Sequence, residues 1–158
     1  MTEGKGAGFP LPRGATGFSR PGDAPLPRTG LRAFRAAVYT AARLAGGSVG
    51  EVREQVYPST FHTASVLDGT AETVVLCHAH HPWVAFARER RTWYDEEFVA
   101  PPPWASAFAL TGFEVLGLDR LTLPLSAVDT SVLSRDERRR LRAYGITALG
   151  GLLFNAWD

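Results

Sequence analysis

Apolar residues recur at helical spacing directly after residue 29. The residues of this stripe lie three or four positions apart: Leu31, Phe34, Val38, Ala41 and Ala45. Such spacing is typical of one buried face of an amphipathic helix. Thr29 precedes the stripe, where a hydroxyl can cap the first turn, and Gly46-Gly47 follows it as a stop signal. The pattern therefore predicts a helix of about four turns.

The pattern changes to that of β-strands after residue 56. The run 70–80 is rich in Thr and Val, follows the turn signal Asp68-Gly69 and stops before Pro82. Residues 84–88 then alternate between large and small side chains, which predicts a hairpin with the first run. Weaker patterns predict two flanking strands, near residues 61–67 and 93–99.

The C-terminal part reads as a pair of helices. Ser134 and Glu137 have the spacing of a capping box, and the helix that they begin ends at Gly145. A second apolar segment follows, in which one helical face can carry Ile146, Leu149, Leu153 and Trp157. Gly150-Gly151 lowers helix propensity there, so we expect close backbone packing or a bend. These elements together predict an α+β domain: a mostly antiparallel sheet with an N-terminal helix and a C-terminal helical pair packed on it.

Composition divides the chain at about residue 28. Residues 1–28 are dense in Gly and Pro and lack periodic apolar positions, so they predict a disordered tail. Residues 29–158 contain the predicted domain. With 158 residues, of which 45% are hydrophobic, the chain can form one ordinary core.

Charge and cysteine content narrow the possible partners and location. The formal net charge is +1, and acidic residues interrupt both Arg-rich runs, 88–91 and 135–142, so we expect no nucleic-acid partner. No apolar run is long enough to span a membrane. Cys77 is the only cysteine, which rules out an intramolecular disulfide and fits a cytoplasmic protein.

Three of the four histidines lie within "CHAHHPW" at the end of a predicted strand. Because strand side chains alternate, His78 and His80 share a face and could bind zinc or another transition metal. The third ligand would be His62, or else Asp95, Glu96 or Glu97 from the following strand. No fixed metal-binding motif is present, so the simpler interpretation is polar residues at a sheet rim and no cofactor.

Catalytic arrangements have less support in the sequence. Cys77 and His78 are adjacent on a strand and point to opposite faces, which places the histidine badly to activate the thiol. Asp95 and Glu97 are the acids in "YDEEF" that could act together. The chain has no nucleotide-binding glycine motif and no serine-hydrolase elbow.

Aromatic residues suggest a different class of function. The four aromatic residues Trp83, Trp93, Tyr94 and Trp104 surround the acids at 95–97 and the prolines at 101–103. Aromatic side chains beside charges are typical of protein-binding patches. We therefore expect a non-catalytic interaction or regulatory protein, such as one that neutralises a toxin, with a metal-binding protein or enzyme centred on His78 and His80 as the alternative.

Overall fold

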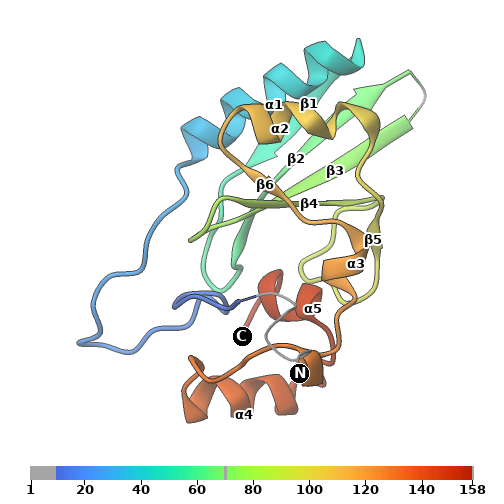
Figure 1. Cartoon of the computed structure of the whole chain (residues 1–158). Helices are drawn as coiled ribbons and strands as arrows, with labels where there is room; N and C mark the ends of the chain where they lie inside the picture. Colours follow the sequence, from blue (N-terminus) through green and yellow to red (C-terminus); the bar gives the residue numbers. More distant parts are fainter. Residues whose placement is uncertain (1–9, 70, 158) are drawn as a thin grey trace.

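The computed structural model describes residues 10–69 and 71–157 (Figure 1). In this part of the chain the helices are α1 (Leu31–Ala45), α2 (Ser106–Leu110), α3 (Leu118–Leu121), α4 (Arg135–Ala143) and α5 (Leu149–Leu153), with 3-10 turns at Pro103–Ala105 and Leu125–Ala127. The strands are β1 (Ser48–Arg53), β2 (Phe61–Asp68), β3 (Ala71–His78), β4 (Trp83–Ala87), β5 (Phe98–Val99) and β6 (Glu114–Val115).

The strands form one sheet in the order β1-β2-β3-β4-β5. All neighbours on this path are antiparallel, and β6 adds a short parallel pairing to β4. The predicted hairpin of β3 and β4 is confirmed, and so is the α+β class. Strand β1 was not predicted, because its partly exposed side chains lack a clear alternation.

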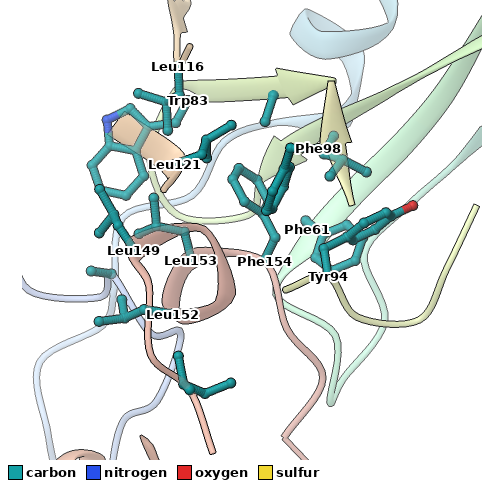
Figure 2. Close-up of a cluster of buried hydrophobic side chains, with 14 of the residues drawn as sticks. Phe61, Trp83, Tyr94, Phe98, Leu116, Leu121, Leu149, Leu152, Leu153 and Phe154 are labelled. Atoms are coloured by element: carbon teal, nitrogen blue, oxygen red, sulfur yellow. The ribbon is translucent and has the colours of Figure 1, made fainter. Parts of the chain in front are cut away.

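Each face of the sheet carries its own hydrophobic core. In the antiparallel register Phe61 lies opposite His78, and His62 lies opposite Cys77, so the two pairs point to opposite faces. Helices α1 and α2 cover the face of Cys77, and α3 and α5 cover the face of Phe61 (Figure 1). The core on the face of Phe61 is rich in aromatic rings, and Phe61 packs edge-on against Tyr94 and Phe154 (Figure 2).

Helix α1 begins without the side-chain cap that the sequence predicts. Its N-cap is Gly30, which follows Thr29. The backbone N–H of Thr29 instead donates to the Ala79 carbonyl at 2.7 Å, and the Thr29 carbonyl accepts a hydrogen bond from His62. Thr29 therefore joins α1 to the sheet. The predicted stop is confirmed, since Gly46 adopts a left-handed conformation with φ of 71°.

Helix α4 follows the prediction closely, but α5 spans only Leu149–Leu153, so Ile146 and Trp157 of the predicted apolar face lie outside the helix. Ser134 and Glu137 form the predicted capping box, with both reciprocal hydrogen bonds present. Helix α5 is short, and a Cβ atom added at Gly150 would lie 2.5 Å from Cε2 of Phe98. The glycine is therefore required by close packing between α5 and the aromatic core (Figure 2).

The Gly150→Ala variant tests this packing. We expect it to lower the free energy of unfolding by roughly 1–3 kcal/mol, because the added methyl group overpacks the core against Phe98. Chemical denaturation measures the effect. Gly112→Ala is an informative comparison, since its methyl group would meet no neighbour within 4 Å and only the left-handed backbone opposes it. Equal stability of Gly150→Ala and wild type would contradict the packing argument.

The N-terminal segment differs from the predicted tail. Residues 1–9 lie outside the described residues, but residues 10–29, which we call the strap, run along the end of the sheet to α1 (Figure 1). Leu11 and Ala15 are buried in the core on the α5 face. The Gly and Pro content that predicts disorder here serves turns, such as the one at Gly14, where φ is 93°. The ordered domain therefore includes at least residues 10–28.

No helix among residues 10–69 and 71–157 has the length and apolar character that a bilayer-spanning segment needs.

Candidate functional site

All four histidines of the chain hydrogen-bond to carbonyl oxygens of the strap. The ring nitrogens and their acceptors are Nε2 of His81 with Arg13 at 2.8 Å, Nε2 of His78 with Ala15 at 2.8 Å, Nδ1 of His80 with Pro27 at 2.9 Å and Nε2 of His62 with Thr29 at 2.8 Å. A carbonyl only accepts, so each of these ring nitrogens carries the proton. The histidines therefore hold both ends of the strap on the sheet.

Two of these rings are fixed at both nitrogens. Nδ1 of His78 accepts from the backbone N–H of His80 at 3.1 Å, and Nδ1 of His62 accepts from that of Gln55 at 2.9 Å. Both rings are therefore neutral Nε2–H tautomers. Burial lowers the pKa of His78 to about 3, and burial also lowers the pKa of His62 and of His80. His62, His78 and His80 therefore remain uncharged donors at neutral pH.

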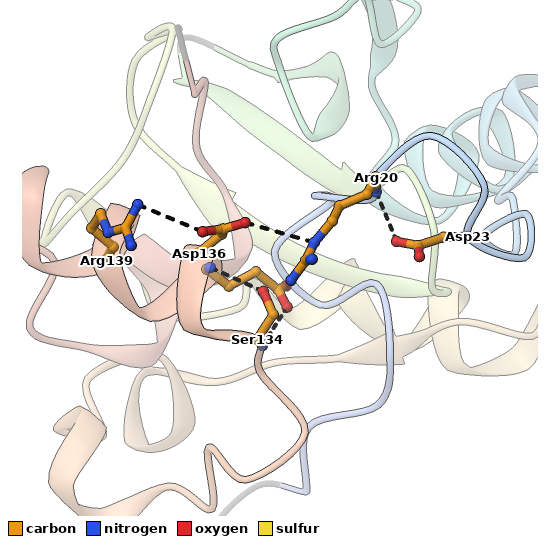
Figure 3. Close-up of polar contacts among 6 residues, drawn as sticks. Arg20, Asp23, Ser134, Asp136 and Arg139 are labelled. Carbon is orange, nitrogen blue, oxygen red and sulfur yellow. Dashed lines mark hydrogen bonds and ion pairs between the residues drawn. The ribbon is translucent and has the colours of Figure 1, made fainter.

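Further contacts attach the strap to the C-terminal helices. The indole N–H of Trp157 donates to the Thr16 carbonyl at 2.6 Å, and the Thr16 hydroxyl donates to the carboxylate of Glu137. Arg20 lies between Asp23 and Asp136, with its guanidinium 3.6 Å from the Asp136 carboxylate (Figure 3). The strap thus bridges the sheet and α4.

The structure brings together only two of the predicted metal ligands. The rings of His78 and His80 lie 5.8 Å apart, whereas His62 points to the opposite face and stacks on Phe34. Among the described residues, no group of three or more His, Cys, Asp or Glu side chains could hold a metal ion. Metal binding by His78 and His80 therefore stays a prediction, for which residues 10–69 and 71–157 supply no third ligand.

A double variant tests the metal hypothesis. If His78 and His80 bind a metal, a strong chelator will lower the melting temperature of the wild type but not that of His78→Ala/His80→Ala. The hydrogen bonds to the strap lead us to expect no chelator effect on either protein. They also lead us to expect a lower melting temperature for the variant, because it loses two donors to the strap.

The other candidate catalytic groups are dispersed. The Cys77 thiol is buried on the α1 face, and this burial raises its pKa. Glu97 accepts a hydrogen bond from the backbone N–H of Asp95 at 2.9 Å, so the two acids are linked locally. One carboxylate oxygen of Asp95 is buried and lacks a hydrogen-bond partner within residues 10–69 and 71–157.

Three of the four aromatic residues predicted to bind a partner are buried. Trp83 and Tyr94 belong to the core on the α5 face, and Trp104 belongs to the core beneath α1. These three rings therefore do not form the exposed patch that the sequence predicts, because each lies in one of the two cores. Trp93 differs, because 51% of its surface is exposed. It is the one member of the set that a partner can reach.

Trp93 stands beside a groove of about 480 Å³. Its lining includes Arg53 at the end of β1 and Val56 just after it, Arg91 and Trp93 from the segment after β4, and Phe61 of β2. Val56 is 72% exposed, and the adjacent Tyr57 is 82% exposed. The sequence pattern did not identify Val56 and Tyr57 as surface residues of a binding site, because this loop has no motif and its apolar side chains resemble a strand.

The rim arginines are already paired with acidic neighbours. Nε of Arg53 lies 2.7 Å from a Glu51 carboxylate oxygen, and a guanidinium nitrogen of Arg91 lies 3.4 Å from Glu89. All four side chains are strongly exposed, so these pairs contribute little stability and can exchange with a partner's acids.

Comparisons of this chain with protein-family models, with curated proteins and with solved structures found no match.

Proposed function

We propose that this protein is a non-catalytic binding protein that recognises a protein partner through the groove beside Trp93. The observation that carries the proposal is the exposure of Trp93 and Val56, which both line one groove. Exposed apolar side chains that gather at a concave site are typical of interaction surfaces.

The residue types at the groove support this proposal. Trp, Tyr and Arg dominate the binding energy of protein interfaces, and here Trp93, Arg53 and Arg91 line the groove with Tyr57 next to it. Among the described residues of the lining, the two arginines outnumber the one acid, Glu54. The chemistry fits a partner segment with an apolar anchor for the groove and an acidic side chain for the rim.

The proposed role is regulation or neutralisation of that partner, of the kind that immunity proteins exert on toxins. The partner would be a protein rather than a nucleic acid, because the net charge of +1 provides no broad basic surface. A cytoplasmic location is part of the proposal and rests on Cys77, a buried thiol without a disulfide partner.

Capture from an extract of the native organism, followed by calorimetry with the purified partner, tests the groove. Loss of a central tryptophan costs at least about 2 kcal/mol of binding energy, so Trp93→Ala should weaken binding by about thirtyfold. Leu110→Ala is the matched control, because Leu110 is 85% exposed on α2, away from the groove. A partner that binds wild type and Trp93→Ala equally would contradict the proposal.

A further inference from the structure

A second and smaller cavity lies between the strap, the loop at residues 55–60 and α4. Its volume is about 180 Å³. Three aromatic side chains line it, Phe18, Tyr57 and Trp157, together with the polar side chains of His80 and Arg140. Segments far apart in the sequence therefore build one site, which adjoins the groove beside Trp93 and shares Pro58 and Ser59 with its lining.

The walls of this cavity are fixed by specific contacts. At Gly17, where φ is 78°, an added Cβ would lie 2.9 Å from the Thr60 side chain, so the strap fits closely against the start of β2. The Thr60 hydroxyl donates to the Leu153 carbonyl at 2.9 Å. The indole of Trp157 is held by its hydrogen bond to the strap. A cavity with such walls is formed before any ligand arrives.

The charges around the cavity favour an anion. None of the described residues that line it is acidic, and the guanidinium of Arg140 lies 4.7 Å from the centre of the Phe18 ring. Arg140 forms no ion pair with a carboxylate among the described residues. Asp136, on the same helix, pairs with Arg20 and Arg139 instead. Arg28 adds positive charge nearby, and its charge contributes to the lowered pKa of His80.

His80 lines the same cavity as Arg140. Its Nδ1–H donates to the Pro27 carbonyl, so in the neutral ring Nε2 is an acceptor. The cavity thus presents aromatic walls and one cationic fork, and Arg140 rather than the unprotonated Nε2 of His80 is the group that can pair with a carboxylate. A guanidinium binds carboxylates with planar, paired hydrogen bonds, which a compact ammonium does not provide.

We propose that this cavity binds a small aromatic carboxylate, with its ring among the aromatic side chains and its carboxylate paired with Arg140. The volume suits a single ring, since an apolar cavity of about 150 Å³ accommodates benzene. The inference goes beyond the proposed function, because it concerns a different cavity and a different class of ligand.

Titration of the full chain with benzoate, followed by amide and indole NMR shifts, tests the proposal. For a ligand of this size we expect a Kd of about 1 mM or lower, with shifts at Ser19, Tyr57, His80 and the Trp157 indole. Benzamide has the same ring without the charge and should bind at least about tenfold more weakly. Acetate lacks the ring and should cause no comparable shifts.

Two arginines on α4 provide the matched variants. Arg140→Gln should weaken benzoate binding by about tenfold or more, whereas Arg139→Gln should leave it unchanged, because Arg139 does not line the cavity. Equal binding of benzoate and benzamide to the wild type would overturn the proposal without any variant. Benzoate shifts outside the cavity, or undiminished binding by folded Arg140→Gln, would overturn it as well.

Discussion

A chain that lacks residues 1–28 is expected to be less stable than the full chain by roughly 4 kcal/mol or more, or to fail to fold. The deletion removes Leu11 and Ala15 from the core on the α5 face. It also removes the carbonyls that accept hydrogen bonds from His78 and Trp157. Urea denaturation followed by tryptophan fluorescence measures the loss.

A chain that lacks only residues 1–9 isolates the contribution of the strap. The strap contacts described above are all retained in this comparison, so the difference between the two truncations reports on residues 10–28. A fully stable chain beginning at Thr29 would show that the strap contributes nothing to folding and would contradict the packing of Leu11 and Ala15.

The second large effect is expected in acid. The pKa of folded His78 is about 3, well below the ordinary value of 6.5 that the unfolded chain has. Between these values the unfolded state binds more protons, so stability is complete above pH 6.5 and falls as the pH decreases towards 3. The contribution from His78 is on the order of 5 kcal/mol, and His62 and His80 act in the same direction.

His78→Gln separates this effect from the general titration of carboxylates. A glutamine amide can still donate to the Ala15 carbonyl but does not titrate. We expect the variant to lose less stability than the wild type between pH 7 and pH 4, measured by urea denaturation at each pH. Parallel pH profiles for the two proteins would show that His78 is not the buried neutral ring that the structure contains.

The elements with strong local signals were predictable from sequence. The stripe from Leu31 to Ala45 and the capping box at Ser134 depend on contacts within a few residues, which a sequence pattern reports directly. Strand β1 gave no such signal, because it lies at the sheet edge and only its pairing with β2 defines it.

The packing of the N-terminal segment on the sheet could not be predicted from the sequence, for a related reason. Its carbonyls are satisfied by histidines 33 to 68 residues away, and no local rule connects a Gly- and Pro-rich stretch to such donors. The contacts of the histidine cluster were hidden in the same way. Its sequence spacing resembles a metal site, whereas in the structure the rings donate to distant backbone carbonyls of the strap.

The candidate binding site was only partly predictable. The sequence identifies Trp93 as an aromatic beside charges, but it does not distinguish Trp93 from Trp83 or Trp104, whose burial depends on the sheet and α1. Val56 and Tyr57 become notable only when the fold leaves them exposed next to the groove. Exposure of an apolar residue is a tertiary property, which composition does not contain.

The most direct test of this account is the protonation of the histidine rings, measured by long-range nitrogen–proton NMR at pH 7.5 with and without added zinc. The hydrogen bonds to the strap predict neutral Nε2–H rings for His62 and His78, a neutral Nδ1–H ring for His80 and a proton on Nε2 of His81. Zinc should leave the spectra unchanged. A different tautomer at His78, or displacement of the His78 and His80 nitrogen signals by one equivalent of zinc, would contradict the histidine-held strap.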